Sequence, residues 1–323
     1  MRSDDARGLP AWQAVETRRL AVGDGHELHV ESFGRPDGIP VVFLHGGPGS
    51  GCQPAHRALF EPDLFRAVLF DQRGAGRSTP RGGRIANTTA HLLADMEAIR
   101  ETLGIDRWLV VGGSWGATLA LAYAQMHPLR VSGVVLRATF LGTRADLDRA
   151  FLETPRVLHP ALYEDFLAVL PEAERDDPLP AYWRRILDPD AAIHRRAAFA
   201  WHDTERILST ARPTATRLDL ASLDDPARAL PSTPFMEAHY FSRDSFLEPG
   251  QLLRDAGRLS SIPGVLVQGR YDLLCPPATS HALAARWPAA RVAMVEGAGH
   301  ALSDPGVTEA VTGALHRVAA TLA

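Results

Sequence analysis

The sequence predicts an α/β fold with a mostly parallel central sheet, helices on both faces and an inserted helical segment. Short apolar runs rich in β-branched residues alternate with segments whose apolar spacing is helical, and this alternation is typical of parallel sheets. The runs stop after residue 139, and helical patterns broken by prolines fill residues 140–246. Two further apolar runs, at residues 264–268 and 292–296, then resume the strand pattern. The inserted segment therefore interrupts one sheet.

The N-terminal elements follow from turn signals and buried runs. Residues 17–22 and 26–33 are predicted to be strands around Gly23-Asp24-Gly25, which is a hairpin turn signal. The next predicted strands lie at residues 40–44, 67–70, 108–111 and 131–136. Helices are expected at residues 87–103, where Gly104 gives a stop, and in the segment from Trp115 to His127-Pro128. The continuous apolar runs indicate strands that are buried on both faces.

The segment at residues 140–246 is predicted to be a helical cap. Its expected helices lie at residues 147–152, 161–170, 181–187 and 191–208. A separate helical domain with no role at the site is the alternative, and the return of the strand pattern favours the cap. The predicted division is a core of residues 1–139 and 247–323 with a cap of residues 140–246. Helices at residues 280–287 and 307–322 complete the second part of the core.

Composition excludes several kinds of chemistry. The 34 basic residues of the 323-residue chain are all arginine, so a Walker-type phosphate loop, a Schiff base and a Ser-Lys dyad are excluded. The net charge of −4 gives no reason to expect nucleic-acid binding. The two cysteines provide neither a disulfide framework nor metal-ligand spacing, and no apolar run reaches membrane-spanning length. We expect a soluble cytoplasmic protein without a metal ion or other cofactor.

The stretch Gly112-Gly113-Ser114-Trp115-Gly116 follows a buried strand and precedes an Ala- and Leu-rich helix. A strand, Gly-x-Ser-x-Gly and a helix in this order are typical of a nucleophile elbow, in which a sharp turn presents the serine. The flanking glycines are expected because a Cβ atom would crowd the neighbouring backbone. A glycine-rich turn with an incidental serine is the alternative.

An elbow serine requires a base and an orienting acid, which follow it in the order acid, then histidine. Asp272 comes directly after the strand at residues 264–268, and His300 directly after the strand at residues 292–296. We predict that His300 moves the proton of Ser114 and that Asp272 orients its imidazole ring. The loop at residues 45–49, the elbow and the loops of Asp272 and His300 each follow a predicted strand, in the expected order. This agreement makes coincidence a poor explanation.

The remaining polar loops have supporting roles in this interpretation. The predicted oxyanion donors are the backbone N–H groups of Trp115 and Gly47, with Gly46 as the alternative second donor. His45 is expected to form part of the wall of this HGGPG loop. The loop at residues 71–78 is expected to hold a buried Asp71–Arg73 ion pair, and Asp304 is expected to cap the terminal helix.

Taken together, these motifs resemble those of the proline iminopeptidase (prolyl aminopeptidase) family of α/β-hydrolases. The resemblance extends from about residue 22 to the C-terminus. It rests on HGGPG at 45–49, DQRGAGRS at 71–78, GGSWGATLAL at 112–121, GRYD at 269–272 and GAGH at 297–300. It implies an α/β-hydrolase fold with a triad of Ser114, Asp272 and His300.

The resemblance also implies a binding site for a free N-terminal amino group. Family members place two cap glutamates there, and the matching positions are Glu205 in AWHDTE and Glu237 in EAHYF. Two carboxylates suit an ammonium group that is held away from water. Phe140 matches a family position in the proline pocket. The family usually has tryptophan directly before the first glutamate, whereas this chain has Thr204, which puts the substrate preference in question.

The predicted function is that of a serine aminopeptidase that releases an N-terminal residue, preferentially proline, from short peptides. Its expected partner is a small peptide or amide substrate with a free N-terminus. The sequence indicates no nucleic-acid or membrane partner and no particular oligomeric state. An esterase or amidase with a cap adapted to a neutral substrate is the alternative. A binding protein with an inactive site is a second alternative, against which the complete triad argues.

Overall fold

The computed structural model describes residues 15–322 and contains an eight-stranded sheet in the order β1-β2-β4-β3-β5-β6-β7-β8. The strands are β1 (Glu16–Ala21), β2 (Glu27–Gly34), β3 (Ile39–Leu44), β4 (Phe65–Asp71), β5 (Trp108–Ser114), β6 (Val131–Thr139), β7 (Gly264–Gly269) and β8 (Ala290–Val295). The pairs β1–β2 and β2–β4 are antiparallel, and all the other neighbouring pairs are parallel. The predicted fold class, that of an α/β-hydrolase, is confirmed.

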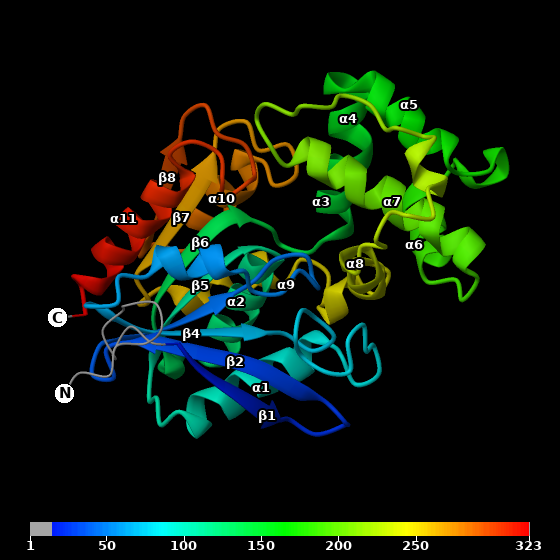
Figure 1. Ribbon diagram of the computed structural model, residues 1–323. Helices are drawn as coiled ribbons and strands as arrows, with labels where there is room; N and C mark the ends of the chain where they lie inside the picture. Colours follow the sequence, from blue (N-terminus) through cyan, green and yellow to red (C-terminus); the bar gives the residue numbers. More distant parts are fainter. Residues whose placement is uncertain (1–14, 323) are drawn as a thin grey trace.

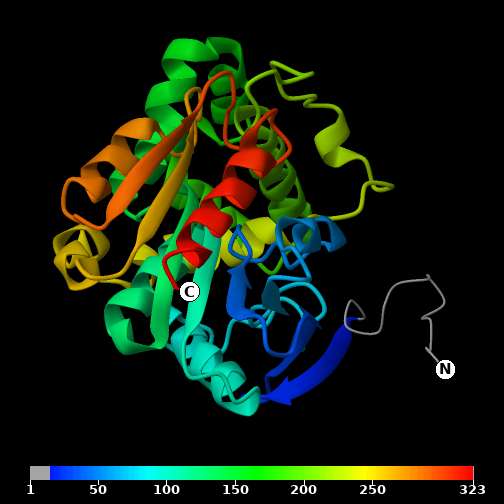
Figure 2. The ribbon, with the colours of Figure 1, turned by 90° about the vertical axis from the view of Figure 1, so that its left-hand side faces the viewer.

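Helices cover both faces of this sheet. On one face lie α1 (Thr89–Thr102), α2 (Trp115–Met126) and α10 (Pro277–Ala284); on the other lie α11 (Val307–Ala319) and the 3-10 helix η2 (Pro54–Leu59). Successive residues of β5 show why its sequence is uniformly apolar. Val110 packs with the α2 side, whereas Leu109 and Val111 pack with the α11 side. Figure 2 shows α11 crossing the face of the sheet that is turned toward the viewer.

The segment between β6 and β7 is helical in the structure. It contains α3 (Arg144–Asp148), the π-helical turn η4 (Arg149–Glu153), α4 (Thr154–Leu158), α5 (Pro160–Ala168), α6 (Pro178–Ile186), α7 (Ala191–Leu208), α8 (Thr233–Phe241) and the short α9 (Gln251–Arg254). Figure 1 shows α3 to α7 gathered beyond one end of the sheet, with α8 between them and the strands. The helix at residues 191–208 was predicted with the observed bounds, and the helix at residues 233–241 was not predicted.

The expected ion pair between Asp71 and Arg73 is wrong. Arg73 instead forms a bidentate pair with Asp95 of α1, with N–O distances of 2.7 and 2.8 Å, and both side chains are buried. Asp71 pairs with Arg77, whose Nε lies 2.8 Å from Oδ2. Asp71 is therefore paired within its own loop, whereas the partner of Arg73 comes from α1.

The expected capping role of Asp304 is also wrong. The residue that precedes α11 is Gly306, in a left-handed conformation with φ of 80°. Asp304 accepts hydrogen bonds from residues 210 and 211, which follow α7, and from residue 299 of its own loop. Within residues 15–322, the structure has no helix that combines the length and apolar character needed to cross a membrane.

Candidate active site

Ser114 ends β5 and immediately precedes α2, with backbone angles φ of 57° and ψ of −124°. An L-residue adopts this conformation only when its surroundings impose it, and such residues concentrate at functional sites. The side chain is partly exposed, whereas the strand behind it is buried. The strand–turn–helix arrangement predicted for the elbow is therefore present around Ser114.

The glycines on either side of Ser114 are required by backbone packing. A Cβ atom on Gly112 would lie 2.1 Å from the carbonyl oxygen of Gly116, and one on Gly116 would lie 2.1 Å from that of Leu44. Both contacts are with backbone, which cannot rotate away as a side chain could. The Gly-x-Ser-x-Gly pattern thus has a steric cause in this structure.

Asp272 and His300 lie in the loops that follow β7 and β8. His300 Nδ1 lies 3.1 Å from each carboxylate oxygen of Asp272, and both residues are buried. Asp272 Oδ1 also accepts the backbone N–H groups of Leu274 and Cys275, at 3.0 and 2.8 Å. These donors hold the carboxylate toward the ring. Among the described residues, the His300 ring forms hydrogen bonds only through Nδ1, and Nε2 makes none, with Ser114 or with any other residue.

Arg137, at the end of β6, connects the elbow with the histidine loop. Its Nη1 donates to the backbone carbonyl of His300, and a Cβ atom on Gly113 would lie 2.6 Å from Nη2. Burial lowers the pKa of this guanidinium, while the nearby Asp272 and Asp304 carboxylates oppose that shift. Arg137 therefore lies between the backbone of Gly113, next to Ser114, and the backbone of His300.

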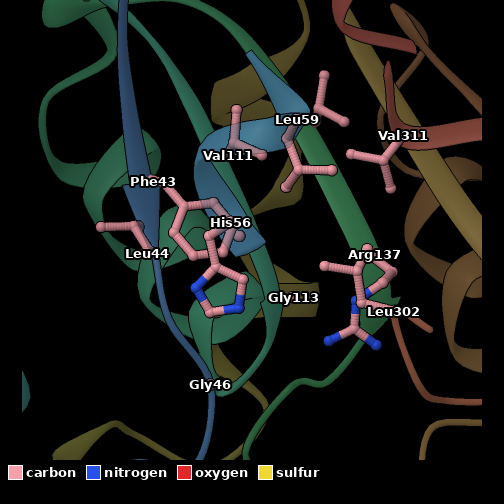
Figure 3. A pocket seen from close by; sticks show the side chains of 12 residues that line it. Phe43, Leu44, Gly46, His56, Leu59, Val111, Gly113, Arg137, Leu302 and Val311 are labelled. Carbon is pink, nitrogen blue, oxygen red and sulfur yellow. The ribbon is translucent and has the colours of Figure 1, made fainter. Parts of the chain in front are cut away.

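A cavity of about 60 Å3 lies behind the elbow, and Gly46, Gly113, His56 and Arg137 form part of its lining. Figure 3 shows the imidazole of His56 and the guanidinium of Arg137 on opposite sides of this space. The His56 Nδ1 accepts the backbone N–H of Gln53 at 3.0 Å, and burial lowers the pKa of His56 to about 4. His56 is consequently neutral near pH 7.

The HGGPG loop passes next to Ser114, as an oxyanion loop requires. A Cβ atom on Gly46 would lie 3.7 Å from the Cβ atom of Ser114. Trp115 begins α2, and the first N–H groups of a helix have no acceptor within the helix. His45 accepts the Gln72 N–H at Nε2, at 3.0 Å, and burial lowers its pKa. His45 is thus a neutral part of the loop wall, as expected.

The two predicted glutamates lie on neighbouring helices, Glu205 on α7 and Glu237 on α8. Glu237 is only 1% exposed, and its Oε2 accepts the indole N–H of Trp201 at 2.6 Å. Its Oε1 is buried without a partner. Burial and the charge of Glu205 raise the pKa of Glu237 well above its usual range. Burial also raises the pKa of Glu205, against the influence of His300. A cationic ligand between the carboxylates would remove this penalty.

The predicted proline-pocket residue, Phe140, directly follows β6 and is buried. Its ring packs edge-to-face on Phe241 of α8, with ring centroids 5.8 Å apart. Thr204 is buried on α7 beside Glu205, and its hydroxyl has no hydrogen-bond partner. The structure thus contains an apolar wall at Phe140 and a small polar side chain where the family usually has tryptophan.

Sequence reasoning missed two residues at this site, Trp201 and Arg137, and assigned Asp304 to helix capping instead of to the contacts that it makes beside His300. Trp201 lies four positions before Glu205, so the two side chains share one face of α7. That spacing is the one sequence signal that could have pointed to Trp201. Arg137 lies inside an apolar strand, where a charged residue is unusual. In the part of the chain that the structure describes, no group of three or more His, Cys, Asp or Glu residues is placed to hold a metal ion.

Residues 39–307 match the family described as the alpha/beta hydrolase fold. A proline iminopeptidase from Xylella fastidiosa is 46% identical over 290 residues, which cover 88% of this chain and 91% of that protein. Proline iminopeptidases from Arabidopsis thaliana and Neisseria meningitidis are 42% and 40% identical over 90% and 95% of this chain, and over 76% and 97% of their own lengths. The chain belongs to the proline iminopeptidase family.

Solved structures agree with this family at the level of the fold. A proline iminopeptidase-related protein from Thermus thermophilus superposes with a TM-score of 0.61, at 24% identity, over 96% of this chain and 98% of that one. The proline iminopeptidase from Mycobacterium smegmatis gives a TM-score of 0.59, at 21% identity, over 95% of this chain and all of that one. In both comparisons the shared fold extends over nearly the whole length of the two chains.

Proposed function

We propose that this protein is a prolyl aminopeptidase that releases an N-terminal residue, preferentially proline, from short peptides by a Ser-His-Asp mechanism. The observation that carries the proposal is the pair of carboxylates formed by half-buried Glu205 and buried Glu237 in the segment between β6 and β7, with Glu205 close enough to His300 for their charges to interact. A hydrolase for neutral esters would have no use for two neighbouring carboxylates held away from water, since burying them costs stability. We also assign residues 140–246 to a cap that carries this pair.

In this proposal the triad catalyses acyl transfer in two steps, which are the acylation of Ser114 and the hydrolysis of the acyl-enzyme. Ser114 Oγ attacks the carbonyl carbon of the first residue while His300 Nε2 takes the hydroxyl proton. The tetrahedral intermediate then collapses, the C–N bond breaks, and His300 returns the proton to the departing amine. Water attacks the acyl-enzyme with the same assistance from His300, and the free amino acid leaves. Asp272 stabilises the imidazolium in both steps.

The negative charge that develops on the carbonyl oxygen requires donors from the backbone. The N–H groups of Trp115 and Gly47 are assigned to this role, with Gly46 as the alternative second donor. The support is the position of Trp115 at the start of α2 and the close approach of the HGGPG loop to Ser114.

Recognition of the substrate depends on its free amino group. A protonated amine can donate to the unpartnered Oε1 of Glu237 and to Glu205, which restores the ionised state of both carboxylates. A blocked or extended N-terminus would bring an uncharged amide against this pair. This requirement makes the enzyme an exopeptidase, and Phe140 supplies an apolar wall for the proline ring.

The location proposed for the protein is the cytoplasm. Its support is the pair of unbridged thiols, Cys52 and Cys275, both of which are buried and free in the structure.

A comparison of three substrates tests the proposal: proline p-nitroanilide, its N-acetylated form and a neutral p-nitrophenyl ester. We expect strong cleavage of the free-amine anilide and at least about 100-fold weaker cleavage of the acetylated form, because a buried carboxylate pair left unpaired costs several kcal/mol. The Ser114→Ala variant should abolish both activities. Equal or faster cleavage of the acetylated anilide would overturn the aminopeptidase assignment and favour the amidase or esterase alternative.

A further inference from the structure

The end of α7, which carries Glu205, is attached directly to the loop that carries His300. The backbone carbonyl of Ser209 accepts the N–H of Ala301 at 2.7 Å. Ser209 lies four residues after Glu205, and Ala301 lies one residue after His300. The distance between the amine-binding carboxylate and the catalytic ring therefore depends on how these two segments are joined.

Asp304 supplies the other bonds of this junction. Its Oδ1 accepts the hydroxyl of Thr210 at 3.0 Å, and its Oδ2 accepts the backbone N–H of Ala211 at 3.2 Å. The same Oδ2 accepts the N–H of Gly299, the residue before His300, at 2.5 Å. One buried carboxylate thus binds the segment after α7 and the histidine loop at the same time.

The two segments are in close contact at Gly299. A Cβ atom there would lie 2.7 Å from the backbone nitrogen of Ala211 and 2.9 Å from Asp304 Oδ2. Only glycine allows this approach. On the opposite side, Arg137 donates to the carbonyl of His300. The backbone around His300 is consequently fixed to β6 by Arg137 and to the end of α7 by Asp304.

We propose that Asp304 is a positioning residue that couples amine recognition to the triad by holding α7 against the His300 loop. Asp304 does not contact the reacting atoms in this proposal. Its carboxylate keeps Glu205 at a constant distance from His300, so that a substrate bound through its amine presents its carbonyl carbon to Ser114. This inference rests on the proposed function and adds a residue to it.

The test separates amine-dependent from amine-independent chemistry. The first readout is kcat/KM for proline p-nitroanilide, and the second is the rate of inactivation by an alkyl fluorophosphonate, which reacts with the triad and carries no amine. Thr210→Val removes only the hydroxyl bond to Asp304. The matched control is Thr312→Val, which removes a part-buried 3.0 Å bond from Thr312 Oγ1 to the Thr308 carbonyl within α11, outside the histidine loop.

We expect Thr210→Val to lower kcat/KM for the anilide roughly three- to tenfold, the size expected for one hydrogen bond, mainly through KM. The fluorophosphonate rate should change less than about twofold, and Thr210→Ser should restore the anilide activity. Asp304→Ala should lower the anilide activity further, because it removes the acceptors of the Thr210 hydroxyl and of the Ala211 and Gly299 N–H groups. Thr312→Val should leave both readouts within about twofold of wild type.

Two outcomes would overturn the positioning role. One is an equal fall of both readouts in Thr210→Val, which would indicate general damage to the triad. The other is an unchanged anilide activity in both Thr210→Val and Asp304→Ala. Thr210→Ala replaces the valine variant if the latter does not fold. Failure of the proposed function would appear differently, in the wild type, as equal cleavage of free and N-acetylated anilides.

Discussion

The indole Nε1 of Trp201 donates to Oε2 of Glu237 across a distance of 2.6 Å, and the other oxygen of that carboxylate remains without a partner. The two residues come from α7 and α8, which lie against each other. One half of the carboxylate is thus satisfied by the protein. The other half is available to a ligand that can donate a hydrogen bond and carries positive charge.

Glu237→Gln should raise KM for proline p-nitroanilide by about 30-fold or more, since truncating one partner of a buried charge pair costs at least about 2 kcal/mol. The rate of fluorophosphonate inactivation should stay within about twofold, because that reagent has no amine. Steady-state kinetics check both values. The exposed Glu172 gives a matched control, and Glu172→Gln should behave as wild type. An unchanged KM in Glu237→Gln would remove Glu237 from the amine site.

Trp201→Phe should raise the pKa of Glu237 further, because a carboxylate that loses an N–H donor holds its proton more tightly. A protonated Glu237 cannot attract an ammonium group, so KM for the anilide should rise as the pH falls, and this rise should begin at a higher pH than in the wild type. Measurements of KM from about pH 5.5 to about pH 8.5, a range that spans neutrality, test this expectation. Trp287→Phe, which removes an indole bonded to the Ile262 carbonyl, is the control. Superimposable pH profiles for wild type and Trp201→Phe would contradict the assignment.

The Glu237→Gln substitution, which is expected to weaken amine binding, should have a favourable effect on the stability of the fold. Burial and Glu205 raise the pKa of Glu237 above its ordinary value of 4.5, so the folded chain binds this proton more tightly than the unfolded chain. Stability from this group is therefore present below pH 4.5 and is lost as the pH rises through the raised pKa. Glu237→Gln should raise Tm at pH 8 by about 2–4 °C, the shift given by about 1 kcal/mol in a large domain. Thermal unfolding at pH 8 and pH 5 checks this, and a Tm gain that grows toward acid would be the wrong sign.

Gly116→Ala should prevent folding or abolish activity, because its Cβ atom would lie 2.1 Å from the Leu44 carbonyl oxygen. Gly257→Ala is the matched control, since a Cβ atom there would meet nothing within 4 Å. We expect soluble, active protein from the control only. Circular dichroism and fluorophosphonate labelling measure the two outcomes. A fully active Gly116→Ala variant would show that the elbow backbone can shift without loss.

Asp95→Asn should lower the free energy of unfolding by about 3 kcal/mol, because it leaves the buried guanidinium of Arg73 with only the exposed Asp24 carboxylate, 3.3 Å away, as its counter-charge. The exposed pair of Arg130 and Asp106 gives the comparison, and Asp106→Asn should cost less than about 1 kcal/mol. Urea denaturation measures both variants. Similar losses in the two variants would show that burial does not determine the contribution of the Arg73 pair.

Local sequence was sufficient for the strands and for the loops that follow them. The apolar runs that become β3 to β7 are short and bounded by turn residues, so their existence did not depend on the rest of the fold. The helix α8 was not predicted, because seven of its nine residues are buried and its apolar residues show no one-sided pattern. A helix surrounded by protein lacks the amphipathic signal on which such predictions depend.

The sequence by itself determined which residues could carry the chemistry: the elbow at Ser114 and the loop residues Asp272 and His300 follow from their places after strands. Only the tertiary structure decided the partners of the charged side chains. Arg73 bonds Asp95 of α1, Trp201 bonds Glu237 of α8, and Asp304 joins the end of α7 to the His300 loop. The physical reason is that strand formation depends on local apolar pattern, whereas a buried charge is paired by whichever segment folding brings next to it.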